Sequence, residues 1–139
     1  MSKFNNVIAM LQEPYVNNKK NISNCPARYD IFPNNRTGHR RTAIFASRHL
    51  KLTEINELCT PNQTTIGGVI NDAKIVFASI NMHYDRPVVT EDMIALVSYC
   101  RKNSFQLIIC ADSNSHSTLW GPTAKVRCKR GEALEEWIL

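Results

Sequence analysis

The chain alternates short apolar runs with polar, turn-forming segments, a pattern that predicts many short strands and few helices. Apolar or β-branched runs predict strands over residues 7–11, 29–32, 42–46, 64–70, 74–82 and 106–111. An imperfect alternation over 51–58 predicts an edge strand. The polar stretch "NNKKNISN" at 17–24 and the basic stretch "RTGHRR" at 36–41 indicate loops between them.

Proline and glycine modify two of these strands. Pro14 restricts the backbone of the preceding residue, so we expect Glu13 to be extended and the first strand to end there. Gly67 and Gly68 interrupt the β-branched run over 64–70, which predicts a bulge or a bend.

The clearest unit is a strand, a helix and a second strand between residues 74 and 111. Thr90 is a suitable N-cap, and the acidic residues at 91 and 92 lie in the first turn, where the helix dipole favours them. Apolar residues at 93, 94, 96, 97 and 100 form one helical face. Because a helical crossover joins parallel strands, we predict an α/β fold with two buried parallel strands. A last helix over 131–139 has Leu134, Trp137 and Ile138 on one face.

Composition narrows the class of protein. A chain of 139 residues is one domain at most, and its net charge of +5 favours an anionic partner, although many soluble domains carry such a charge. The five cysteines form no CxxC pair, which predicts a reducing compartment, no disulfide and no zinc site. We expect Cys100 and Cys110 to pack as small hydrophobic residues. No apolar run reaches the roughly 18 residues of a membrane span, and nothing points to a stable protein partner.

Polar side chains follow three of the predicted strands, and in open α/β sheets ligands bind beyond the carboxyl ends of strands. These side chains are Gln12 and Glu13, then Asn81, His83, Tyr84 and Asp85, and finally Asp112, Asn114 and His116. Glu13 and Asp112 are suited to share a hard divalent cation such as Mg²⁺. Such a site hydrolyses a phosphate ester: the ion stabilises charge on the phosphoryl oxygens, Asp112 orients or deprotonates water, and Asn114 donates to a phosphate oxygen. The basic stretch, with Arg40 and Arg41, would follow a nucleic-acid backbone.

The same residues have structural interpretations. A glutamate before proline is often a solvated strand end, and Asp-x-Asn after a strand is often a turn because both residues cap their own backbone. His116 fits a helix cap, a turn residue or a general base. Tyr84 and Trp120 suit packing better than recognition, and the basic stretch is equally a solvated loop.

Four stretches in order are more specific than any of these residues alone: "LQEPYV", "ASINMHYD", "ADSNSHSTLWG" and "RGEALEEWIL". Together they resemble the endonuclease/exonuclease/phosphatase superfamily and, within it, the apurinic-endonuclease-like domain of arthropod non-LTR retrotransposons. The resemblance runs from about Val7 to Leu139. It implies a two-sheet α/β sandwich with helices outside, Mg²⁺ or Mn²⁺ as cofactor, DNA as substrate, and an intracellular, nuclear location.

The resemblance also implies residue roles. Glu13 would be the metal ligand, Asp112 the water-orienting acid and Asn114 the phosphate-contacting amide, which agrees with the interpretation from the residues themselves. His116 is typical of the retrotransposon branch and is not the family's catalytic histidine. The family usually has tyrosine where this chain has Asn81. The remaining candidate substrate contacts are Asn81, Tyr84, His116, Arg40 and Arg41.

The chain departs from the family at both ends. The family's domain opens with a strand that carries a metal-site Asn and closes with a Ser-Asp-His motif that supplies a metal-site Asp and the catalytic His. We therefore expect residues 1–139 to form a partial domain, an incomplete sandwich that lacks the first strand and the C-terminal catalytic segment. The expected function is the DNA endonuclease of a retrotransposon polyprotein, in the context of a reverse transcriptase, with low or no activity in this chain.

Two alternatives stay open at this point. One is a catalytically dead remnant that binds DNA without cutting it. The other is a different phosphoesterase of the same superfamily, acting on phosphoinositides or nucleotides. The sequence signature Leu119-Trp120-Gly121 followed by Arg130-Gly131 argues against the second alternative.

Overall fold

The computed structural model describes residues 6–15, 26–33, 40–121 and 126–139. The strands are β1 (Ile8–Gln12), β2 (Tyr29–Phe32), β3 (Thr42–Ser47), β4 (Thr53–Glu54), β5 (Gln63–Ile70), β6 (Ala73–Asn81) and β7 (Gln106–Asp112). The helices are α1 (Glu91–Asn103) and α2 (Lys129–Ile138), with 3₁₀ turns η1 (Arg48–Leu50) and η2 (Asn56–Leu58). The strands predicted at 29–32, 42–46, 74–82 and 106–111 therefore form within one residue of their expected bounds.

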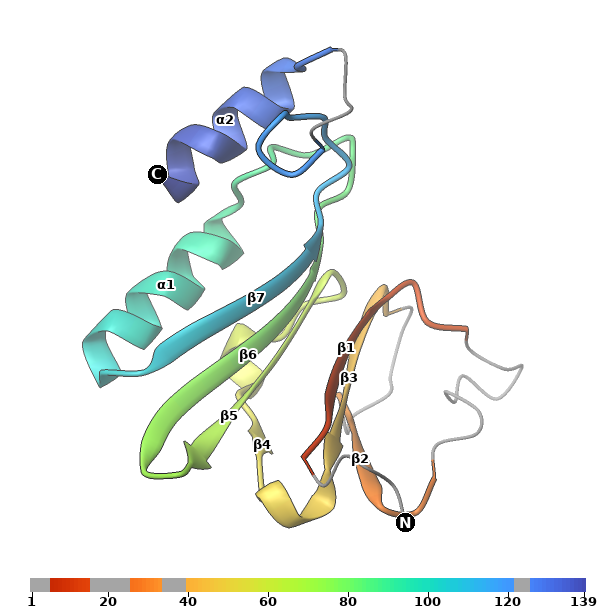
Figure 1. Ribbon diagram of the computed structural model, residues 1–139, viewed down its shortest axis with the longest axis vertical. Helices are drawn as coiled ribbons and strands as arrows, with labels where there is room; N and C mark the ends of the chain where they lie inside the picture. Colours follow the sequence, from red (N-terminus) through yellow and green to blue (C-terminus); the bar gives the residue numbers. More distant parts are fainter. Residues whose placement is uncertain (1–5, 16–25, 34–39, 122–125) are drawn as a thin grey trace.

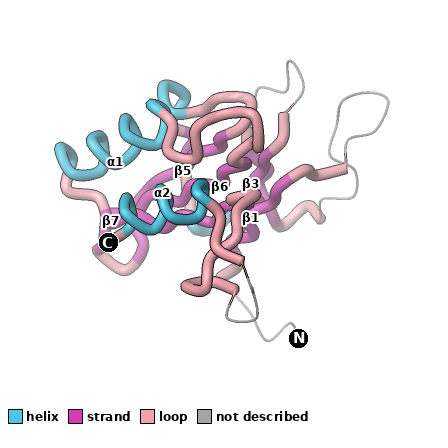
Figure 2. Tube along the Cα trace, turned by 90° about the horizontal axis from the view of Figure 1, so that it is seen from above, coloured by secondary structure: helices cyan, strands magenta, loops and turns pink. Residues whose placement is uncertain are grey.

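These elements form three layers. A three-stranded antiparallel sheet, in the order β1-β3-β2, faces a four-stranded sheet in the order β4-β5-β6-β7. Helices α1 and α2 lie on the outer side of the four-stranded sheet (Figure 1), and the view from above shows the same order (Figure 2). Strands β6 and β7 are parallel, from Ile75 beside Gln106 to Asn81 beside Asp112, so the predicted strand–helix–strand crossover is confirmed.

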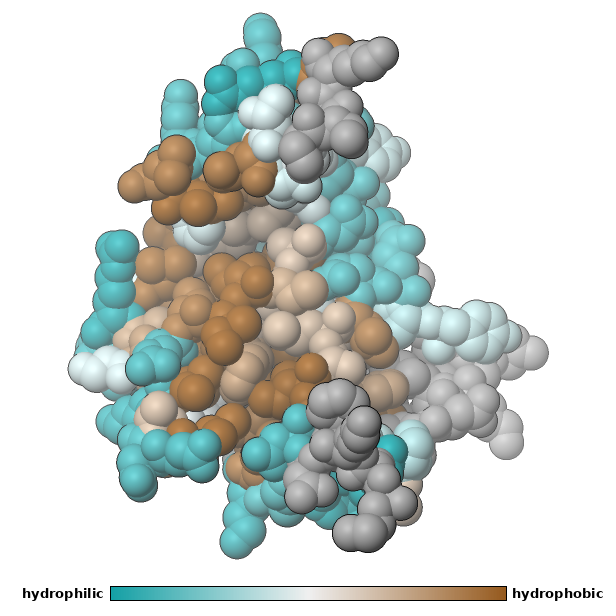
Figure 3. Space-filling view, viewed as in Figure 1, coloured by the Kyte–Doolittle hydropathy of each residue, from teal (hydrophilic) through white to brown (hydrophobic). Residues whose placement is uncertain are grey.

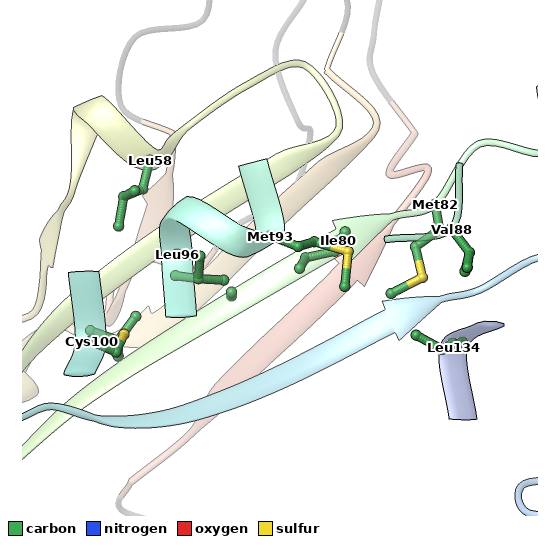
Figure 4. Close-up of a cluster of buried hydrophobic side chains, with 10 residues drawn as sticks. Leu58, Ile80, Met82, Val88, Met93, Leu96, Cys100 and Leu134 are labelled. Atoms are coloured by element: carbon green, nitrogen blue, oxygen red, sulfur yellow. The ribbon is translucent and has the colours of Figure 1, made fainter. Parts of the chain in front are cut away.

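Strand β6 is the centre of the molecule because its two faces serve two cores. Ile80 packs with Met93 and Leu96 of α1 (Figure 4). Val76 and Ala78 belong to the same buried cluster. Phe77 packs on the other face, in the core between the sheets. Successive side chains of a strand point to opposite faces, so every second residue of β6 is directed between the sheets. This alternation decides which polar residues at the end of β6 can meet β1.

The predicted bulge at Gly67 and Gly68 is wrong. Strand β5 pairs with β6 without interruption from Gln63 beside Ile80 to Ile70 beside Ala73. The glycines instead make room for neighbouring side chains, since a Cβ on Gly68 would lie 2.8 Å from Leu52 Cδ2 and one on Gly67 3.1 Å from Ile55 Cδ1. Close packing explains the glycines, and the segment over 51–58 forms only the two-residue strand β4 followed by the turn η2.

Strand β7 is less buried than the sequence indicates. Within the described residues it is the outer strand of its sheet, so Ile108 is 45% exposed and Cys110 is only half-buried, although Cys100 is buried as expected. Apolar side chains gather on the face over β7 and between the two helices (Figure 3). Ile138 lines a cleft with Leu107 and Ile109 of β7 and is 54% exposed, rather than lying in the core with Leu134. No helix in the described part of the chain has the length and apolar character to cross a membrane.

Helix α1 begins as the sequence predicts. The Thr90 hydroxyl accepts a hydrogen bond from the Met93 backbone N–H at 3.3 Å, and Ser104, with a φ of 57°, ends the helix in the left-handed region. The Thr90 cap therefore fixes the end of the loop that joins β6 to this helix. That loop and the one after β7 carry the candidate functional residues.

Candidate active site at the carboxyl ends of β1, β6 and β7

Gln12, the last residue of β1, connects the ends of three strands. Its side-chain Nε2 donates to Ser79 Oγ on β6 at 3.2 Å and to the Cys110 carbonyl on β7 at 3.1 Å. In return the Ser79 hydroxyl donates to the Leu11 carbonyl at 2.8 Å. The carboxyl ends of β1, β6 and β7 are thus held together across the space between the two sheets.

The strand register then places two predicted site residues on the side of β1. Ser79 and Cys110 both face Gln12, and residues two positions further along a strand face the same way. Asn81 and Asp112 are those residues, and they are direct neighbours in the parallel pairing of β6 and β7. Asn81, Asp112 and the strand that leads into Glu13 are therefore brought to one edge of the molecule.

Glu13 leaves β1 in an unusual conformation. Its φ is 47°, in the left-handed region, so the prediction of extended backbone before Pro14 is wrong. A hydrogen bond from the Glu13 N–H to the Arg41 carbonyl, at 2.6 Å, holds the backbone there. Such a conformation costs a non-glycine residue about 1–2 kcal/mol and is found where the surroundings fix it. The Glu13 side chain that follows this strand end is 66% exposed.

Arg40 and Arg41 border the Glu13 carboxylate. A small cleft of about 190 Å³ is lined by Glu13, Pro14, Arg40 and Arg41. Arg41 Nη1 lies 3.4 Å from Glu13 Oε1, and Arg40 Nη1 donates to the Thr60 carbonyl at 2.8 Å. The rest of the predicted basic loop, residues 36–39, lies outside the described residues.

Asp112 and Asn114 form a turn, as one of the two sequence interpretations predicted. Asp112 Oδ1 accepts from the Asn114 backbone N–H at 3.2 Å, and Asn114 has a φ of 46°, which asparagine tolerates. The Asn114 side-chain amide donates to the Met82 carbonyl at 3.3 Å. Both side chains are exposed in this arrangement. A structural role for the pair is therefore compatible with a chemical one.

Asn81 and Tyr84 occupy very different environments. Asn81 is 3% exposed, and its Oδ1 has no hydrogen-bond partner among the described residues. Tyr84 is 75% exposed and its ring lies against His83, 4.5 Å between centroids. The structure thus places Asn81 at the carboxyl end of β6 and Tyr84 in the loop that follows, where Tyr84 packs on the His83 ring and not in a core. Trp120 is also partly exposed, and its Nε1 donates to the Ser115 carbonyl at 3.3 Å.

His116 acts through its backbone in this structure. Its N–H donates to Cys128 Sγ at 3.2 Å, and its carbonyl accepts from the Cys128 N–H at 3.3 Å. Hydrogen bonds from the backbone N–H groups of His116 and Gly131 lower the pKa of the Cys128 thiol. Cys128 is the N-cap of α2, so this pairing ties the loop after β7 to the start of that helix.

Two residues that position the site were not singled out for this role from the sequence. Arg130 donates to carbonyls of the loops after β6 and β7, and Gly131 lets α2 approach the loop after β7. Their only sequence signal is the dipeptide Arg130-Gly131 itself. Among the described residues no cluster of three or more His, Cys, Asp or Glu could hold a metal ion.

The protein is thus of the α/β class, with two facing sheets. Carboxylate and amide side chains stand at or just after the carboxyl ends of β1, β6 and β7. The chain is similar to a solved structure, the endonuclease domain of TRAS1, a telomere-specific non-LTR retrotransposon. The two share 25% sequence identity with a TM-score of 0.70, over 93% of this chain. This confirms the predicted fold class and the predicted resemblance to retrotransposon endonucleases.

The chain spans 55% of the length of that TRAS1 chain. No protein-family model matches the sequence. No curated protein sequence matches it either.

Proposed function

We propose that this chain carries the site of a metal-dependent DNA endonuclease of the retrotransposon type. The observation that supports it is the arrangement of three strand ends: Gln12, the residue before Glu13, holds the ends of β1, β6 and β7 together, and Asn81 and Asp112 are paired at the ends of β6 and β7. The similarity in fold to a retrotransposon endonuclease domain supports the same reaction class. The substrate would be DNA, and the bond broken a phosphodiester.

The oxygen donors at the carboxyl ends of β1, β6 and β7 are of the chemical kind that a hard divalent cation binds. Glu13 offers an exposed carboxylate, Asp112 a second one, and Asn81 Oδ1 is a buried acceptor without a partner among the described residues. Carboxylate and amide oxygens are the ligands that Mg²⁺ and Mn²⁺ take in proteins. Glu13 would hold the ion with help from Asp112. When bound, the ion supplies positive charge that stabilises the phosphoryl oxygens.

Side chains of the protein would accept the proton, contact the phosphate and hold the DNA. Asp112 would accept a hydrogen bond, and then a proton, from the attacking water. The Asn114 amide carries two N–H donors, and the bond to the Met82 carbonyl uses one of them. The second N–H would donate to a phosphate oxygen without adding repulsive negative charge. Arg40 and Arg41 would hold the DNA backbone beside the scissile bond.

The first experiment is nicking of supercoiled plasmid by the purified chain with Mg²⁺, with EDTA and as the variant Glu13→Gln. We expect slow nicking that EDTA abolishes and that Glu13→Gln reduces at least tenfold, about 1.4 kcal/mol of barrier. We propose a low rate because the described residues bring no histidine side chain into the cleft beside Glu13. Nicking that is insensitive to both EDTA and Glu13→Gln would contradict the proposal.

The ion pair between Arg41 and Glu13 favours a second candidate function, DNA binding without cleavage. An arginine beside the carboxylate competes with a metal ion for it and leaves the cleft suited to phosphate. In this case Arg40→Gln and Arg41→Gln would each weaken DNA binding regardless of sequence. Each would also reduce the slope of log affinity against log salt by about 1.

The salt slopes are measured by fluorescence anisotropy with a short DNA duplex, and Lys51→Gln serves as a charge-matched control. Lys51 is an exposed cation in the turn that precedes β4, beyond the opposite end of β3 from Arg40 and Arg41. A slope that falls equally in all three variants would show that only net charge matters, and would remove Arg40 and Arg41 from the proposed DNA-binding surface.

A further inference from the structure

The guanidinium of Arg130 joins the two loops that carry the proposed site. Its Nε donates to the Ser113 carbonyl at 3.1 Å, in the loop after β7. Its Nη2 donates to the carbonyls of Met82, at 2.8 Å, and His83, at 3.0 Å, in the loop after β6. Nη1 donates to the Arg86 carbonyl in the same loop. A planar guanidinium with several fixed donors can span four carbonyls in this way.

The hydrogen bonds of the Arg130 guanidinium described above all go to backbone carbonyl oxygens. Within the described part of the chain, no carboxylate lies at ion-pair distance from it. Hydrogen bonds from a charged donor are stronger than neutral ones, so these carbonyls are held firmly. Arg130 therefore fixes the distance between the loop after β6 and the loop after β7.

The Met82 peptide links this clamp to the proposed catalytic groups. Its carbonyl accepts from both Arg130 Nη2, at 2.8 Å, and Asn114 Nδ2, at 3.3 Å. Its N–H donates to the Asp112 carbonyl at 2.9 Å. The orientation of the Asn114 amide thus depends on a carbonyl that Arg130 holds in place.

We propose that Arg130 is the positioning residue of this site, and that it orients the Asn114 amide and the Asp112–Asn114 turn through Met82. Its effect on DNA cleavage rests on the endonuclease function proposed above; its effect on the Asn114 side chain does not. Arg130 itself touches neither the cleft around Glu13 nor the Asp112 carboxylate in this structure.

Helix α2 has other anchors, so it is expected to stay in place without Arg130. Cys128 caps its first turn, and the buried Glu135 carboxylate binds Ser117 Oγ and the Arg127 guanidinium.

Two substitutions of Arg130 separate its charge from its geometry. Lysine at position 130 keeps the charge but cannot reach all four carbonyls, and glutamine removes the charge. Lys129→Gln is the matched control, because Lys129 is an exposed cation one position earlier in the same helix.

The experiment compares Arg130→Lys, Arg130→Gln and Lys129→Gln by ¹⁵N–¹H NMR of side-chain amides, with the Asn114 signals assigned through Asn114→Ala. We expect both Arg130 variants to shift or broaden the Asn114 NH₂ signals, and Lys129→Gln to leave them unchanged. In plasmid nicking, Arg130→Gln should lower kcat about tenfold or more with little change in KM, and Arg130→Lys should be intermediate.

Each result decides something. Unchanged Asn114 signals in a folded Arg130→Lys or Arg130→Gln protein would overturn the positioning role, whether or not the chain cuts DNA. A rise in KM with kcat unchanged would also overturn it, since that result indicates direct DNA contact. If the unaltered chain does not nick DNA while the Asn114 signals respond to Arg130, the positioning role stands and the endonuclease function fails.

Discussion

Replacing Asp112 with asparagine is expected to reduce Mg²⁺-dependent nicking by about a hundredfold or more, because a group that takes a proton from water contributes on that scale. Asparagine keeps an oxygen that can accept from the Asn114 N–H, so the turn after β7 should survive. The substitution therefore removes the negative charge and the basicity of one side chain with little effect on the fold. The measurement is single-turnover nicking with protein in excess over plasmid, which resolves a slow rate.

Asp85→Asn is the matched control for this prediction. Asp85 is an exposed aspartate in the neighbouring loop after β6, and a hydrogen bond from His83 lowers the pKa of its carboxyl. It takes no part in the proposed reaction, so the rate should change less than twofold. Equal losses in Asp112→Asn and Asp85→Asn would show that Asp112 has no special role.

DNA binding supplies a second readout for Asp112→Asn if cleavage is too slow to follow. Removing a carboxylate beside a phosphate-binding surface should leave the affinity unchanged or raise it. A large loss of affinity in a folded Asp112→Asn protein would contradict the proposed placement of Asp112 beside the scissile phosphate.

Replacing Gly131 with alanine is expected to destabilise the protein by about 2–4 kcal/mol, at the upper end of overpacking effects. A Cβ on Gly131 would lie 2.1 Å from the His116 carbonyl oxygen and 2.9 Å from its carbonyl carbon. Both are backbone atoms, so relief requires α2 and the loop after β7 to move apart. Urea unfolding followed by the fluorescence of the two tryptophans measures the change.

Glu136→Ala tests whether the effect belongs to that contact. Glu136 is exposed in the last turn of α2, and its replacement should change the free energy of unfolding by less than about 0.5 kcal/mol. Gly131→Ala should also disturb the Asp112–Asn114 turn, because the same loop carries it. A Gly131→Ala protein as stable as the unaltered chain would show that α2 and the loop can separate at no cost.

Local pattern was sufficient to predict most of the strands and both helices. The alternation in β6, the cap at Thr90 and the strand–helix–strand order depend on neighbours in sequence, and the structure has them. The exposure of β7 was predicted wrongly, since it depends on the strand's place in the sheet. The glycines of β5 were misinterpreted for a similar reason: their role is contact with Leu52 and Ile55, which pattern alone does not reveal.

The sequence by itself determined the α/β class, the resemblance to retrotransposon endonucleases and the positions of the polar strand ends. Only the tertiary structure decided that Gln12 gathers these ends, that Glu13 has a φ of 47° beside Arg41, and that Arg130 clamps two loops. The physical reason is the distance along the sequence between the residues in contact. Strand and helix patterns follow from side chains a few residues apart, whereas these contacts join residues 17 to 98 positions apart and exist only after the sheets and α2 have packed.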